Sequence, residues 1–176
     1  MFAQLDTKSV YSFMDSVVDL NTYVKRAKEL GYQSIGLMDR DNLYAAYHFA
    51  QLAIRNGLRP LIGTEANLFY EGRKIPFRLL AKNNQGYKNL MKLATELSSG
   101  QREFTYFSDY LNDIALILPS EDWEPGMSLG SEVFIGVRPE DAGKEFDYPV
   151  VPLHTVRYFE NADRSTIQTL HAISQN

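Results

Sequence analysis

The sequence contains no cysteine, and this absence excludes several kinds of chemistry. Without thiols the chain forms no disulfide, no thiolate metal site and no cysteine nucleophile. Histidine is also scarce, with three residues in 176. A lack of cysteine suits the reducing cytosol, so we predict a cytoplasmic protein.

Long apolar runs and an excess of basic residues are also lacking. No apolar stretch approaches the ~18 residues that a transmembrane helix needs, and no signal peptide is recognisable, so we expect no membrane association. With 18 Lys and Arg against 22 Asp and Glu, the formal net charge is −4. This segment by itself therefore has no basic field with which to bind nucleic acid.

The remaining composition is that of an ordinary globular domain. Apolar residues make up 44%, aromatic residues 12% and charged residues 23% of the chain, which argues against disorder. A length of 176 residues favours one domain.

Helical and strand patterns alternate along this domain. We expect helices over residues 20–30, 41–56, 84–99 and from about 161 onward. The second helix is apolar around most of its circumference, which predicts heavy burial. Strands are expected over residues 2–12, 33–39, 60–65, 76–82, 113–119, 132–137 and 149–153. Seven strands interleaved with helices predict an α/β fold, either a barrel or a doubly wound sheet.

The first strand carries polar side chains on one face. Gln4, Asp6 and Lys8 alternate with apolar or small residues, so the period of two places all three on the same side. This pattern fits a strand that lines a polar site, and it equally fits an edge strand with one solvated face.

Polar residues also follow the strands at the points where the strands end. They are Asp6 and Lys8, then Asp39, Arg40 and Asp41, then Glu65, and finally residues 154–157. In parallel α/β folds, functional groups gather at the carboxyl ends of the strands. Strand ends are also where any chain becomes loop, so this clustering alone does not identify a site.

Five segments carry a resemblance to a known family. They are residues 2–12, 35–42, 57–65, 79–90 and 154–158. Together, and in this order, they resemble the polymerase and histidinol phosphatase (PHP) domain. The likeness is greatest to the form at the N-terminus of bacterial DNA polymerase III alpha subunits, of the Gram-positive type.

The resemblance implies a fold and a parent protein. The implied fold is a distorted seven-stranded (β/α) barrel, TIM-like, with residues 1–176 as the PHP domain at the N-terminus of a much longer polymerase chain. A last helix without a glycine stop also suggests a longer chain. DNA-directed DNA synthesis, a Mg²⁺-dependent nucleotidyl transfer, would belong to the polymerase core of that chain. The core is the expected partner, and contacts with DNA and replisome proteins would be made through the parent.

The sequence departs from this family at its metal ligands. The resemblance implies histidines at the positions of Gln4, Asp6 and Lys8, and another after Asp39, where this chain has Arg40. Lys and Arg offer no lone pair at neutral pH and repel a cation.

The later ligand positions have changed as well. Thr155 and Arg157 stand where the family has an acid and a histidine, so Asp39 and Glu65 alone remain of the implied ligand set. A His that the family has near Pro76 is absent too. We therefore expect no metal, no cofactor and no catalytic residue in this domain.

These replacements lead to the hypothesis of a vestigial pocket held by ion pairs. Its cations are Lys8, Arg40 and Arg157, and its anions are Asp6, Asp39 and Glu65. Leaving a buried carboxylate unpaired costs ~3–5 kcal/mol, and an Arg guanidinium satisfies two oxygens at once. The predicted function is that of a catalytically inactive structural and interaction module.

Other functions remain open. The main alternative is a metal-dependent phosphoesterase or 3′–5′ proofreading nuclease, and a freestanding histidinol phosphate type of phosphatase is a third. A weak magnesium site would use the oxygens of Asp6, Asp39, Asp41 and Glu65. His48 and His171 are expected to be packed or surface residues, and His154 is the histidine nearest the expected pocket.

Overall fold

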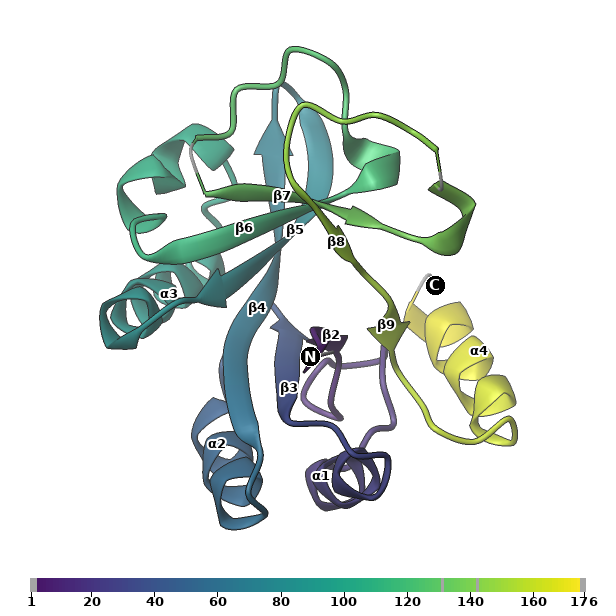
Figure 1. Ribbon diagram of the computed structural model, residues 1–176. Coiled ribbons are helices and arrows are strands. Elements are labelled where there is room, and N and C mark those ends of the chain that lie inside the picture. Colours follow the sequence, from purple (N-terminus) through teal and green to yellow (C-terminus); the bar gives the residue numbers. More distant parts are fainter. Residues whose placement is uncertain (1–2, 131, 142, 175–176) are drawn as a thin grey trace.

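Seven strands form one curled sheet in the computed structural model, which describes residues 3–130, 132–141 and 143–174 (Figure 1). Phe2, in the predicted first strand, and the ends of the predicted domain lie outside the described residues. Across the sheet, the strands are β1 (Ala3–Gln4), β3 (Ser34–Arg40), β4 (Arg59–Tyr70), β5 (Arg73–Ala81), β6 (Ile114–Pro119), β7 (Val133–Val137) and β8 (Val150–Pro152). Neighbours are parallel except β5, which is antiparallel to β4 and β6.

A second, two-stranded sheet joins the two ends of the first. β2 (Asp6–Thr7) continues from β1, and β9 (Thr155–Val156) continues from β8. These two strands pair in parallel, with Asp6 opposite Thr155. Hydrogen-bonded strands therefore connect β1 with β8 across the first sheet. The β2–β9 pair, whose strands continue from β1 and β8, joins the two edges of that sheet. The predicted α/β class and distorted seven-stranded barrel are confirmed, although β9 was not expected as a separate strand.

Leu5, which separates β1 from β2, passes directly against β3. A Cβ atom at Gly36 would lie 2.3 Å from the carbonyl oxygen of Leu5. Only glycine permits this approach of one backbone to another. Gly36 thus allows the first strand to leave its pairing with β3 and turn toward β9.

The α-helices lie outside the curled sheet (Figure 1). They are α1 (Leu20–Glu29), α2 (Ala46–Arg55), α3 (Asn84–Ser98) and α4 (Asp163–Ser174), and the 3-10 helices are η1 (Phe104–Tyr110), η2 (Ser120–Asp122) and η3 (Pro139–Asp141). The side chain of Asp19 caps α1 by accepting from the Thr22 N–H, and the side chain of Asn83 caps α3. In the part of the chain that the structure describes, no helix is long and apolar enough to cross a membrane.

Helix α2 begins later than predicted, at Ala46 instead of Asp41. Asp41 has a positive φ of 55°, which is incompatible with a right-handed helix. The Asn42 side chain then accepts from the Tyr44 N–H, so a turn precedes the helix.

The prediction that α2 is heavily buried is wrong. Its buried residues are Ala46, Phe49 and Ala53, whereas Tyr47 is 71% and Ile54 65% exposed. The helix packs one face against β4, and its solvent-facing side carries Tyr47 and Ile54 among polar residues.

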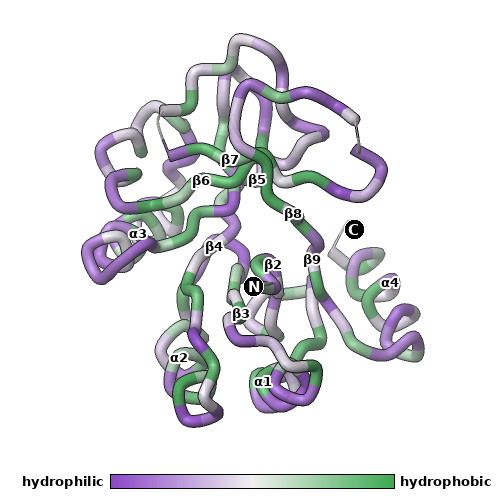
Figure 2. Tube along the Cα trace, viewed as in Figure 1, coloured by the Kyte–Doolittle hydropathy of each residue, from purple (hydrophilic) through white to green (hydrophobic). Residues whose placement is uncertain are grey.

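Apolar side chains gather in two clusters. One contains Phe77 and Leu79 of β5 together with Leu90 of α3, and the other joins Ile35 of β3 to Phe49 of α2. Figure 2 shows hydrophobic residues along β6, β7 and β8. Because strand residues alternate faces, the face of β5 opposite Phe77 and Leu79 is free to carry a different kind of side chain.

Candidate functional site

Three charged side chains occupy matching positions on neighbouring strands. Arg40 at the end of β3 lies opposite Glu65 of β4, and Glu65 lies opposite Arg78 of β5. Residues directly opposite one another project to the same face of a sheet. The sheet therefore places these three side chains in one row.

Lys8, just after β2, lies at the centre of a group of buried ion pairs. Its Nζ donates to Asp6 Oδ1 at 2.7 Å and to the Met38 carbonyl oxygen at 2.6 Å, and it lies 3.0 Å from Glu65 Oε2. The Lys8 side chain is 0% exposed. An ammonium group has three N–H donors, and these three contacts use them all.

Arg78 completes the same group from β5. Its Nε donates to Asp6 Oδ2 at 3.0 Å, and its Nη2 lies 3.3 Å from Glu65 Oε2. The Thr155 hydroxyl also donates to Asp6 Oδ2, at 2.6 Å, and Arg40 Nε donates to Glu65 Oε1 at 3.1 Å. Both oxygens of each buried carboxylate are therefore engaged, as a stable buried ion pair requires.

These partners also determine the ionisation of the two acids. Burial by itself raises the pKa of Asp6, but the charges of Lys8 and Arg78 outweigh it and lower that pKa to about 2. For Glu65, burial likewise raises the pKa, and Lys8 and Arg78 lower it below its ordinary value. Both carboxylates are ionised at neutral pH as a result.

Asp39 holds a loop and makes no ion pair with a described residue. Its Oδ1 accepts from the Ser9 N–H and from the Ser12 hydroxyl, and its Oδ2 accepts from the Ser9 hydroxyl, all at 2.7 Å. The Asp39 residue is 2% exposed. The hypothesis opposed Asp39 to a cation, and the structure instead gives it the hydroxyl and amide donors of the segment after β2.

Arg40 links the buried ion pairs to a second group around Asp15. Arg40 Nη2 donates to Asp15 Oδ2 at 2.8 Å, Arg157 Nε donates to Asp15 Oδ1 at 2.9 Å, and His171 Nε2 lies 2.9 Å from the same oxygen. The hypothesis opposed Arg157 to other carboxylates. Arg157 pairs with Asp15 instead, because the loop that carries Asp15 folds back against Arg157. In this loop the Val17 N–H donates to the Arg157 carbonyl at 3.1 Å.

Of the predicted pocket residues, the structure brings Asp6, Lys8, Arg40 and Glu65 together, and it places Asp39 and Arg157 in the adjoining contacts. The interpretation of the first strand as a solvated edge is wrong, because Asp6 and Lys8 are fully buried. Gln4 is also buried, but its Nε2 donates to the backbone carbonyls of Asp6 and His154 and not to the ion pairs.

Two residues of the site were missed by sequence reasoning. Arg78 carried a usable signal, since it is a charged residue within the otherwise apolar run of β5. Asp15 carried none, because it lies in a loop without any periodic pattern. His171, expected to be packed or on the surface, contacts Asp15 with a half-exposed side chain, whereas His154 is exposed.

The donor set does not fit the metal centre that the family resemblance implies. Lys8 Nζ and the Arg78 guanidinium lie against the carboxylate oxygens that an ion would need, and neither has a lone pair to offer. Among residues 3–130, 132–141 and 143–174, no three His, Asp or Glu side chains are grouped so that they could hold a metal ion. Asp41, from the weak magnesium alternative, pairs with Arg102 at 2.9 Å.

Comparisons with known proteins agree with the motifs in the sequence. Residues 4–124 match the model of the PHP domain. The chain is 46% identical over 178 residues to DNA polymerase III subunit alpha of Streptococcus pyogenes serotype M1, which covers 100% of this chain and 17% of that protein. The same subunit of Bacillus subtilis (strain 168) is 33% identical over 126 residues, which covers 68% of this chain and 11% of that protein.

A solved structure of an amidohydrolase from Chromobacterium violaceum is 18% identical, with a TM-score of 0.47 over 56% of this chain and 34% of that chain. Among the relatives compared by sequence, the streptococcal subunit is much longer than this chain, which spans 17% of its length.

Proposed function

The chain belongs to the PHP domain family, and from this membership we propose that it is a structural and interaction module of a DNA polymerase III alpha subunit, without catalytic activity of its own. In this proposal residues 1–176 form the N-terminal domain of a longer polymerase. The parent performs DNA-directed DNA synthesis in the cytoplasm, with Mg²⁺ bound in its polymerase portion. The domain's partner is the polymerase core, and DNA and replisome proteins are reached through the parent.

The observation that carries the proposal is the position of Lys8. Its ammonium lies between Asp6 and Glu65, and its positive charge offsets the charge of these two buried carboxylates. A phosphoesterase centre needs an electrophile with open positions, to generate a nucleophilic water and to stabilise charge on the phosphoryl oxygens. An ammonium whose three donors are already used supplies neither function.

The surrounding charges support the same proposal. Asp6, Asp15, Asp39 and Glu65 are the buried acids of this site, and Lys8, Arg40, Arg78 and Arg157 are the Lys and Arg side chains near them. Among these described side chains, with His171 left out of the count, four carboxylates face four Lys and Arg groups, so their charges balance without an added ion. We propose that this balance keeps the barrel folded in place of metal ions.

The test is metal binding combined with activity. The 176-residue chain, purified without chelator, is expected to contain no stoichiometric Zn, Mn or Fe by elemental analysis. Adding Zn²⁺ or Mn²⁺ should not raise its Tm, because a ligand stabilises a fold only when it binds the folded state. Hydrolysis of bis(p-nitrophenyl) phosphate and of single-stranded DNA should stay at the level of buffer containing the same metal.

The contrary result would be a bound metal together with phosphodiester hydrolysis that Asp6→Asn abolishes. Lys25→Met, altered at a side chain 79% exposed on α1, is the matched control for both measurements. That result would establish the phosphoesterase or nuclease alternative.

A further inference from the structure

The loop after β2, residues 9–16, has its polar side chains inside and its apolar side chains outside. Its buried polar residues are Ser9, Ser12, Asp15 and Ser16. Its exposed apolar residues are Val10, Tyr11 and Phe13, and Phe13 is 83% exposed. This is the reverse of the usual distribution, in which Ser and Asp face water and Phe is buried.

Contacts of the buried polar groups hold the loop in this orientation. Asp39 accepts three hydrogen bonds from the loop, and Asp15 pairs with two arginines. Met14, which separates the outward Phe13 from the inward Asp15, has a positive φ of 59°, a conformation that costs free energy in a bulky residue. Phe13 could turn inward only if these buried groups lost their partners, so its exposure is built into the fold.

The turn before α2 adds a further aromatic residue. Asn42 Nδ2 donates to the Tyr11 carbonyl at 3.1 Å, and Asn42 Oδ1 accepts from the Tyr44 N–H at 3.1 Å. Tyr44 is also exposed, so the two segments joined by Asn42 both present aromatic side chains to solvent. Exposed apolar side chains that gather on a well-held segment are typical of a surface that another part of a protein covers.

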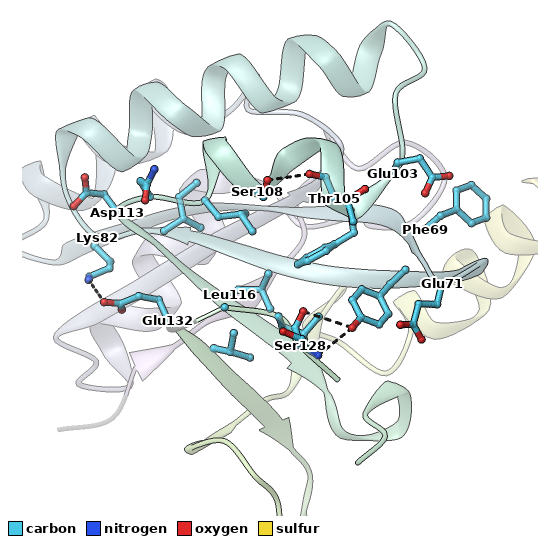
Figure 3. Close-up of a pocket in the computed structure, with 18 residues that line it drawn as sticks. Phe69, Glu71, Lys82, Glu103, Thr105, Ser108, Asp113, Leu116, Ser128 and Glu132 are labelled. Atoms are coloured by element: carbon cyan, nitrogen blue, oxygen red, sulfur yellow. Dashed lines mark hydrogen bonds and ion pairs between the residues drawn. The ribbon is translucent and has the colours of Figure 1, made fainter. Parts of the chain in front are cut away.

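The larger cavity between η1, β6 and β7, of about 720 Å³, is lined differently (Figure 3). Its apolar residues Leu116, Leu129 and Val133 are buried. Figure 3 shows Lys82 paired with Glu132 at one end. The loop after β2 therefore offers more accessible apolar surface than this cavity does.

Helix α4 ends at the same loop. Phe13 lines a cavity of about 280 Å³ together with Arg157, His171 and Ser174, the last residue of α4. Among the described residues of α4 only Ile167 is buried, so the helix packs lightly on the domain. In the streptococcal relative, the region that matches this chain is 17% of the protein. In the proposed parent, the rest of the polymerase follows α4 and so starts beside Phe13.

We propose that the loop of residues 9–16 is the docking surface for the stretch of the parent chain that directly follows residue 176. Apolar side chains of that stretch pack on Val10, Tyr11 and Phe13 and remove them from water. Because this stretch is tethered beside the loop, its effective concentration is in the millimolar range, and a few apolar contacts hold it. This docking rests on the proposed function, since it requires the longer polymerase.

Photo-crosslinking in the full-length gene product identifies the occupant. The photoreactive amino acid p-benzoylphenylalanine takes the place of Phe13, and the irradiated protein is digested for mass spectrometry. The expected cross-link joins position 13 to a residue within about 30 positions after 176 in the same molecule, the length of two ordinary helices with their connection. The same amino acid in place of Tyr47, which is exposed on α2, is the matched control and should not reach that stretch.

A substitution then measures how firmly the stretch is held. In the full-length product, Phe13→Ser should speed proteinase K cleavage just after residue 176 by at least about tenfold, because cleavage follows the population of the undocked form. Tyr47→Ser should leave the rate unchanged. In the 176-residue chain, Phe13→Ser should leave the Tm unchanged, since Phe13 is exposed there.

The docking is overturned if position 13 cross-links to a second copy of the chain, to a more distant part of the parent or to nothing. It is also overturned if Phe13→Ser leaves cleavage unchanged or lowers the Tm of the 176-residue chain. Each of these results is compatible with a domain free of metal and activity, so the proposed function would stand. A gene product that ended at residue 176 would instead overturn the proposed function, and the docking with it.

Discussion

The ammonium of Lys8 lies 2.7 Å from a carboxylate oxygen of Asp6, and both side chains are 0% exposed. Asp6 of β2 and Lys8, which follows directly after that strand, thus form an ion pair inside the barrel. Glu65 and Arg78 then join them from β4 and β5. The stability of the domain should depend on these charges as a set, and this expectation can be tested residue by residue.

Lys8→Met should destabilise the domain by about 3–5 kcal/mol, because it leaves buried carboxylates without one of their cations. Urea unfolding followed by circular dichroism measures the change. Lys25→Met removes an exposed Lys at the surface of α1 and should change stability by less than about 0.5 kcal/mol. Equal stability of the two variants would contradict the proposed role of Lys8.

Stability should fall at acid pH. The pKa of Asp6 in the folded chain is lowered to about 2, below the value of about 3.9 in an unfolded chain. Its contribution of about 2–3 kcal/mol is therefore complete above pH ~4 and is lost as the pH falls through about 2. Glu65, whose pKa is also lowered, acts in the same direction.

Thermal unfolding between pH 6 and pH 2 measures this dependence. In Asp6→Asn the slope over the acid part of the range should be smaller than in the wild-type chain, although the variant is less stable throughout. A wild-type Tm that stays constant down to pH 2 would show that these carboxylates are not paired in the folded state.

Asp39→Ala should loosen the segment that follows β2. It leaves the Ser9 N–H and the hydroxyls of Ser9 and Ser12 without their acceptor, and each unsatisfied buried group costs about 1–3 kcal/mol. Hydrogen exchange at the Ser9 amide should accelerate more than exchange in α3. Asp109→Ala, at an exposed position in η1, should leave Ser9 protected.

Gly36→Ala should disturb the start of the barrel. Its added Cβ would meet the Leu5 carbonyl at 2.3 Å, so the strand must shift, at a cost of about 1–3 kcal/mol for overpacking. Ser34→Ala, two residues earlier in β3, adds no atom toward another backbone and should cost less. Chemical denaturation of the two variants gives the comparison, and equal costs would contradict the close approach described here.

Much of the fold was predictable because strand and helix patterns are local. The strand predicted over residues 76–82 and the helix predicted over residues 84–99 follow from nearby residues, and the structure has both, as β5 and α3. Strand β9 was not expected, since it is two residues long and exists through its pairing with β2. The start of α2 was misplaced because the positive φ of Asp41 depends on contacts beyond its own sequence.

Four residues of the site, Asp6, Lys8, Arg40 and Glu65, were predictable from the sequence, but the pairs that they form were not. Alternation in the first strand placed Asp6 and Lys8 on one side, and strand ends supplied Arg40 and Glu65. Which cation pairs with which acid depends on the strand register and on which loops fold back against the strand ends. That is why Arg157 was assigned to the wrong carboxylates, and why Asp15, in a loop, was not found at all.

The pairing of β2 with β9 also sets the order in which the molecule can be completed. Thr155 donates to Asp6 across 149 positions of sequence, so one of the contacts to the central carboxylate is made by β9, the last of the described strands along the chain. Contacts between such distant residues slow folding, because a long loop must close before they form. During synthesis on a ribosome, Asp6 and Lys8 therefore stay incompletely enclosed until β9 has emerged. Only then does β9 pair with β2 and close the barrel.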